Sequence, residues 1–79
     1  MTAEQAAMRQ ALRQNLQREL LHELQLAHRM IFNALAVMTP EQKSEWAARN
    51  ILSGNDSEGT TRAHEREAVI ARAMEAQRV

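Results

Sequence analysis

Apolar side chains recur every three or four residues along the N-terminal half of the chain. This spacing places them on one side of an α-helix. Neither Gly nor Pro occurs before Pro40, so nothing interrupts a helix up to that point. The first steps are all of four residues, which makes the apolar stripe drift around the helix axis. The pattern predicts a helix over residues 3–38 with these stripe positions: Met8, Leu12, Leu16, Leu20, Leu24, Ala27, Ile31, Leu35 and Met38.

Two capping signals mark where helices begin. Thr2 is followed three residues later by Gln5, and Thr39 is followed by Gln42 at the same spacing. In such a capping box the hydroxyl and the amide side chain satisfy backbone groups at the helix start. Pro40 suits the first helical position and disfavours helical geometry at the residue before it. A second helix is therefore expected to begin at Pro40, directly after the first one ends.

The second helix is expected over residues 40–52, with Gly54 as its C-terminal stop. Residues 53–59 are rich in Gly, Ser, Asn and Asp and predict a loop. The side of the second helix that we expect to be buried carries Trp46, Ala47, Ile51 and Leu52.

A third helix is expected over residues 61–77, with Thr60 or Thr61 as its N-terminal cap. The chain has no run of alternating Val, Ile, Thr and aromatic residues, which strands would need. These features predict an all-α fold in a single domain of residues 1–79. The thin apolar side of the third helix consists of Ala63, Val69, Ile70, Ala73 and Met74.

The end of the first helix, residues 30–38, is apolar almost all round and therefore needs cover on every side. The two shorter helices cannot cover a rod that is about 54 Å long. A second copy of the chain would supply the missing cover, so we expect a helical-hairpin homodimer. Its predicted core consists of Leu24, Ala27, Met30, Ile31, Leu35 and Met38.

Composition narrows the class of protein. The 79-residue chain has no cysteine, and its ten basic and ten acidic side chains cancel. A neutral chain has no bulk attraction to nucleic acid or to a membrane surface. Its longest wholly apolar run, residues 34–38, is far shorter than a bilayer-spanning segment, and its N-terminus lacks the pattern of a secretory signal. We therefore expect a cytoplasmic protein.

The chain offers little material for catalysis or metal binding. His22 and His28 are six residues apart, which turns their rings to different sides of a helix, and His64 is remote in sequence. A pair of metal-binding histidines on one helix face needs a spacing of four. A Gly-rich phosphate loop is absent as well. The sequence therefore predicts a non-enzymatic protein without a cofactor or a metal.

A protein-binding module fits the composition best. Arg outnumbers Lys nine to one, and Arg is enriched in protein interfaces because its planar head pairs with carboxylates and stacks on aromatic rings. The third helix combines a thin apolar side with a charged rim, which is typical of an interface core. Its predicted partner-binding residues are Arg66, Val69, Ile70, Arg72 and Met74. The alternative is that this side, and Val69 and Ile70 above all, packs on the dimer core instead.

Two other functions compete with this interpretation. A small nucleic-acid-binding regulator would use Arg9, Arg13 and Arg18 to contact phosphates, although Glu4 and Glu19 dilute that face. Binding of this kind would weaken steeply as the salt concentration rises, whereas a hydrophobic protein interface would not. A structural subunit would instead form assemblies larger than a dimer.

The segment from Met30 to Gln42, which reads Met-Ile-Phe-Asn-Ala-Leu-Ala-Val-Met-Thr-Pro-Glu-Gln, is followed by a short helix that carries Trp46. This arrangement resembles small early-region proteins of transposable Pseudomonas phages. That family includes dimeric helical proteins that bind and inhibit host regulators, among them quorum-sensing activators. The resemblance covers the middle third of the chain and carries over no functional residue. It implies an anti-activator that sequesters a host transcriptional regulator by surface complementarity.

Overall fold

The structure is a computed structural model that describes residues 2–56, 59 and 61–78. Its regular elements within these residues are three helices, which confirms the predicted all-α fold with one long N-terminal helix. None of the described helices combines the length and the apolar character that crossing a bilayer requires. The helices are α1 (Ala3–Val37), α2 (Pro40–Leu52) and α3 (Ala63–Ala76).

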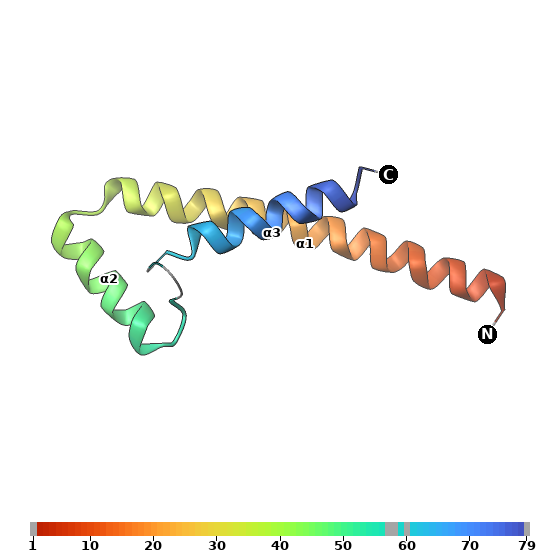
Figure 1. Ribbon diagram of the computed structural model, residues 1–79, viewed down its shortest axis with the longest axis horizontal. Coiled ribbons are helices and arrows are strands. Elements are labelled where there is room, and N and C mark those ends of the chain that lie inside the picture. The colour runs from red at the N-terminus through yellow and green to blue at the C-terminus, as the bar shows by residue number, and fades with distance from the viewer. Residues whose placement is uncertain (1, 57–58, 60, 79) are drawn as a thin grey trace.

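The molecule is a rod with a hook at one end (Figure 1). Helix α3 runs back along α1 in the opposite direction, α2 turns away from the end of α1, and the first turns of α1 extend beyond the end of α3 with nothing beside them. The rod measures 58 × 23 × 17 Å. Its radius of gyration is 17.3 Å, compared with about 12 Å for a compact domain of this length. The chain on its own is therefore far from globular.

The contact between α1 and α3 follows alternating steps of three and four residues on both helices. Leu21 is the one buried residue among those described, and it belongs to this contact. Such steps keep one narrow side of each helix facing its neighbour. We call this contact the seam: on α1 it contains Leu21, Leu24, His28 and Ile31, and on α3 the half-buried residues Ala63, Arg66, Ile70 and Ala73.

Both predicted capping boxes are formed. The hydroxyl of Thr39 accepts a hydrogen bond from the backbone N–H of Gln42 at 3.2 Å, and the Gln42 side chain accepts one from the backbone N–H of Thr39 at 2.8 Å. Thr2 and Gln5 make the same pair of bonds at the start of α1. The break between α1 and α2 therefore lies where the Thr39-Pro40 pair predicts it.

Helix α2 ends in a Schellman motif. The N–H of Gly54 donates to the carbonyl of Ile51 at 3.0 Å, and the N–H of Asn55 donates to the carbonyl of Asn50 at 2.9 Å. Gly54 has a φ of 69°, in the left-handed region where glycine has no steric penalty. The prediction that Gly54 stops α2 is confirmed.

The predicted buried side of α2 is only partly correct. Trp46 and Ala47 are half-buried, but Ile51 and Leu52 are exposed. The expectation for these last two residues is wrong because α2 turns away from the α1–α3 pair, so its far end points away from the other two helices (Figure 1).

The start of α3 also differs from its prediction. Arg62, and not a threonine, is the N-cap, and it has a left-handed backbone with a φ of 55°. Thr61 lies one residue earlier, and its hydroxyl accepts a hydrogen bond from the N–H of Ala63 at 3.3 Å. Thr60, the other predicted cap, lies outside the described residues.

Substitution of Thr39 tests the boundary between α1 and α2. Thr39→Ala removes the oxygen that accepts from Gln42, so we expect the free energy of unfolding to fall by about 1 kcal/mol. Thr39→Ser keeps that oxygen and should lose less. Urea titration followed by circular dichroism measures both losses, and equal stability of all three proteins would contradict the role of this cap.

Candidate protein-interaction surface

The first turns of α1 carry apolar side chains that no other described part of the chain covers. Gln14, Gln17 and Arg18 are the first α1 residues beside the end of α3, so residues 3–13 form an overhang (Figure 1). We call the apolar residues on and just after the overhang the α1 stripe: Met8 and Leu12, each 66% exposed, Leu16 at 54% and Leu20 at 60%.

The α1 stripe leads into a hollow between α1 and α3 of about 220 Å³. Leu20 belongs to both, because it ends the stripe and lines the hollow. The lining is largely apolar, with the side chains of two helices facing one space. The hollow is lined from α1 by Gln17, Leu20, Leu21 and Leu24, and from the other side by Val69, Ala73 and Ala76 of α3 and by Gln77 just after it.

Helix geometry explains why the stripe winds into the hollow. Each residue turns the chain by about 100° around the axis, so a step of four residues leaves a side chain about 40° from the previous one. From Met8 to Leu20 the stripe makes three such steps in the same direction. It therefore starts on the open side of α1 and reaches the side that α3 occupies. Leu20 therefore joins the stripe to the hollow.

The accessible surface of the whole chain shows how much is left uncovered. It amounts to 6594 Å², whereas a folded monomer of this mass exposes about 4,850 Å². The excess of roughly 1,700 Å² falls in the range that one partner of an obligate complex buries, about 1,000–2,500 Å².

A polar clasp holds α3 against α1 further along the seam. Nε of Arg66 donates to Nδ1 of His28 at 2.9 Å, and Nη1 of Arg66 donates to the carbonyl of Thr61. Because Nδ1 of His28 accepts, the ring proton lies on Nε2, which is 3.7 Å from a carboxylate oxygen of Glu67. The ring of Phe32 meets the His28 ring edge to face, with centroids 4.8 Å apart. Of these contacts, the His28–Arg66 hydrogen bond and the approach of His28 to Glu67 join the two helices and favour one register of α3 along α1.

The predicted dimer core is divided between two sides of α1. Leu24, Ile31, Leu35 and Met38 are half-buried, whereas Ala27 and Met30 are exposed. Ala27 and Met30 lie on the side that the α1 stripe occupies, since Ala27 is 11 residues after Leu16 and Met30 is 18 residues after Leu12, close to whole numbers of turns.

The predicted partner-binding residues of α3 also separate. Arg66 and Ile70 belong to the seam, and Val69 lines the hollow. Arg72 and Met74 are exposed, and the Met74 sulfur lies 3.7 Å from the amide nitrogen of Gln25 on α1. Val69 and Met74 therefore remain open to a partner, and Arg66 and Ile70 hold the fold together. Whether this edge of α3 binds a protein stays a prediction.

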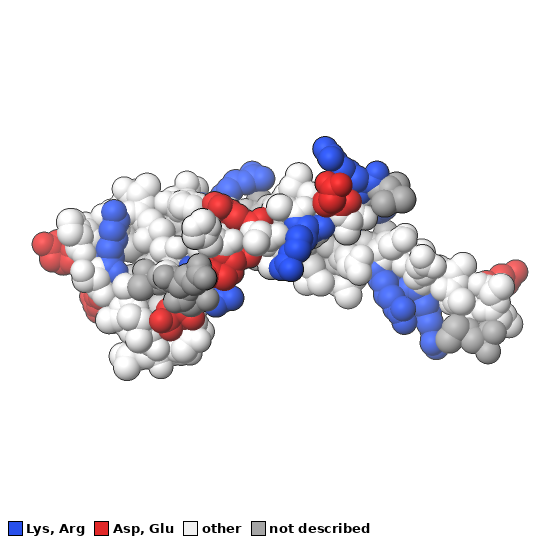
Figure 2. Space-filling view, viewed as in Figure 1, with Lys and Arg blue, Asp and Glu red and all other residues white. Residues whose placement is uncertain are grey.

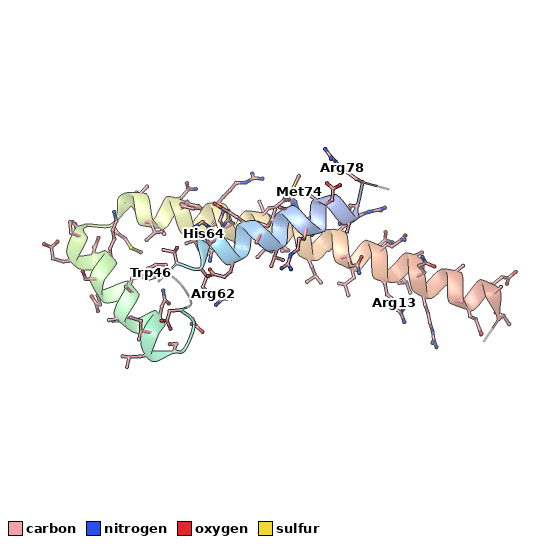
Figure 3. All side chains as sticks on the ribbon, viewed as in Figure 1. Arg13, Trp46, Arg62, His64, Met74 and Arg78 are labelled. Carbon is pink, nitrogen blue, oxygen red and sulfur yellow. The ribbon has the colours of Figure 1, made fainter. Side chains whose placement is uncertain are left out.

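The three arginines of the alternative function do not share one side of α1. Arg9 and Arg18 are nine residues apart, or two and a half turns, so their side chains leave opposite sides of the helix. Arg13 projects from the overhang away from Met74 and Arg78 (Figure 3). Basic and acidic side chains alternate along the face of the α1–α3 pair in Figure 2. This arrangement does not form a continuous basic track.

Clusters of three or more His, Cys, Asp or Glu side chains placed to hold a metal ion do not occur among the described residues. The surface that stands out is thus apolar. The predicted dimer core begins at Leu24, later along α1, and does not contain Leu12 and Leu16 of the α1 stripe. Their signal was present: the steps of four before Leu24 give way to the three-four steps of the seam, which indicates that the helix changes the side it presents.

Substitution of His28 tests the clasp. His28→Ala leaves Nε of the half-buried Arg66 without its acceptor, so we expect a loss of about 1–3 kcal/mol in the free energy of unfolding. Glu45→Ala is the control, because it breaks an exposed ion pair with Arg49 on α2 that contributes about 0–1 kcal/mol. Equal losses in thermal or urea unfolding would contradict the structural role of His28.

Comparison with protein-family models, with curated proteins and with solved structures gave no match to this chain.

Proposed function

We propose that this chain is a non-enzymatic protein-binding module whose binding surface is the α1 stripe together with the hollow beside α3. The observation that carries this proposal is the large exposed area of 6594 Å², with an apolar stripe at its open end. A soluble monomer rarely exposes a continuous apolar patch of this length unless the patch binds something.

The energetics favour a covered stripe. Burying one Leu or Met side chain completely stabilises a protein by about 1.5–3 kcal/mol. The stripe has four such side chains, all more than half exposed in the single chain. A helix end as short as the overhang has little stability of its own. A partner that covers the stripe therefore gains apolar burial and orders the overhang at the same time.

The shape of the surface supports binding of a protein and not of a small ligand. The stripe, which makes up most of the length of this surface, is convex and runs along one helix, whereas small-molecule sites are concave and surround their ligand. Only the hollow at the end of the stripe is concave. A helix that presents residues at steps of four is a common protein-recognition element. Sequestration of a regulator, which the resemblance to phage proteins implies, is one use of such a module and forms part of this proposal.

Nucleic-acid binding has less support. Arg9 and Arg18 are two and a half turns apart on α1, so they point to opposite sides of the helix. The arginines therefore do not share one face. Phosphate contacts depend on several cations that follow one backbone.

A matched pair of double variants tests the proposed surface. Leu12→Glu with Leu16→Glu places two charges on the stripe, and Gln10→Glu with Ala11→Glu places two charges on exposed positions outside it. We expect the stripe variant to lose all protein association, whether with itself or with host proteins, because a buried carboxylate without a partner is costly. The control variant should behave as the wild type.

The measurement combines light scattering of the purified proteins with affinity capture from host lysate, read by mass spectrometry. Proteins captured by the wild type and the control variant, but not by the stripe variant, would support the proposed surface, as would self-association with the same dependence. A stripe variant that associates as well as the wild type would contradict it.

A further inference from the structure

We infer that the α1 stripe is occupied by the stripe of a second copy of this chain, with the two α1 helices antiparallel and crossing near Leu16. This inference rests on the proposed function, since it names the occupant of the same surface. Four features of the chain favour it: the uncovered area, the spacing of the stripe, the position of one charged pair and the position of the hollow.

The uncovered area suits a symmetric pair. The accessible surface of the chain is larger than that of a folded monomer of its mass by roughly 1,700 Å². Each partner in a standard interface buries about 800 Å², which is less than this excess. Two copies that contribute the same surface therefore have enough area for a stable dimer. The stripe suits this arrangement because an interface around a two-fold axis must be self-complementary.

The spacing of the stripe sets how two copies meet. Residues four apart form a ridge that is inclined to the helix axis, and two such ridges pack together when their helices cross at about 50°. The stripe from Met8 to Leu20 is a ridge of this kind. With the crossing point at Leu16, Leu12 of one copy lies opposite Leu20 of the other. Met8 of one copy then lies opposite Leu24 of the other.

A charged pair distinguishes the antiparallel arrangement from the parallel one. Arg9 lies seven residues before Leu16 and Glu23 lies seven residues after it, so both leave α1 on nearly the same side as Leu16. Both are exposed and have no ion pair within the described part of the chain. An antiparallel pair centred on Leu16 places Arg9 of each copy opposite Glu23 of the other. A parallel pair would place Arg9 opposite Arg9 and Glu23 opposite Glu23, which repel.

The hollow gives the end of the partner's stripe a place to pack. Leu24 lines it, and Met8 of the second copy reaches Leu24 in this arrangement. Methionine is unbranched and adapts to an irregular space. The overhang of each copy is then covered by the α1–α3 pair of the other, which removes the exposed helix end that the single chain leaves.

Light scattering of the unmodified protein over a range of concentrations is the first test. We expect twice the mass of one chain at micromolar concentration. The stripe variant, Leu12→Glu with Leu16→Glu, should raise the dissociation constant by about a hundredfold or more, because it buries unpaired carboxylates. The control variant, Gln10→Glu with Ala11→Glu, should remain a dimer. A wild type with the mass of one chain at all concentrations would overturn the inference.

Cysteine cross-linking tests the orientation, and the chain has no cysteine of its own to interfere. Leu16→Cys should form a disulfide with itself on oxidation, because the two copies of residue 16 meet at the crossing point. Met8→Cys should not do so alone, but a mixture of Met8→Cys and Leu24→Cys chains should cross-link. Self-cross-linking of Met8→Cys would show a parallel pair and overturn the inference.

A charge exchange checks the same point without cysteine. Arg9→Glu should weaken the dimer, and the double variant Arg9→Glu with Glu23→Arg should restore it. Failure to restore it would overturn the antiparallel register. The homodimer and the proposed protein-binding function can fail separately. A wild type that is monomeric but still captures a host protein through its stripe would contradict the homodimer alone. A chain that associates with nothing would sink the proposed function as well.

Discussion

The difference in length between α1 and α3 is the constraint on which the rest of the structure depends. Helix α1 has 35 residues and α3 has 14, so they extend over about 52 Å and 21 Å. Helix α2 does not reduce this difference, because it turns away after Thr39. The remaining length of α1 carries Met8 and Leu12 and is not a polar extension. An uncovered apolar helix end is therefore built into the fold.

The covered and the uncovered parts of α1 have different roles. The seam, which contains the buried Leu21, holds the chain together, and the His28–Arg66 hydrogen bond selects the register of α3 within it. A polar pair at such a position favours one alignment over alignments shifted by a turn, because a shifted α3 would leave Arg66 without its acceptor. The exposed side chains of the α1 stripe do not contribute to this alignment of α3 on α1. A change on the stripe should therefore leave the fold of the single chain intact.

Much of the fold could be predicted because its signals are local. The capping boxes at Thr2 and Thr39 and the glycine at position 54 set helix ends through hydrogen bonds to residues only a few positions away. The side that each helix buries could not be predicted as well, because it depends on where α3 docks. Leu24 belongs to one continuous pattern in the sequence, but in the structure it marks the change from the stripe to the seam. The left-handed Arg62 has no sequence signal, since arginine has no preference for that backbone conformation.

Because α1 is an uninterrupted helix, the number of residues between two positions fixes the angle between their side chains around the helix axis. With no Gly or Pro in 35 residues, the helix has nothing to absorb a twist between Leu16 on the stripe and Leu21 in the seam. Inserting a single residue between them would rotate the stripe by about 100° about the axis and move it by about 1.5 Å, while every contact of the seam stays in place. Inserting four would rotate it by only about 40° and move it by about 6 Å. The five-residue spacing between Leu16 and Leu21 thus sets the direction in which the α1 stripe faces relative to the seam. Insertions and deletions between these residues would change that direction without unfolding the chain.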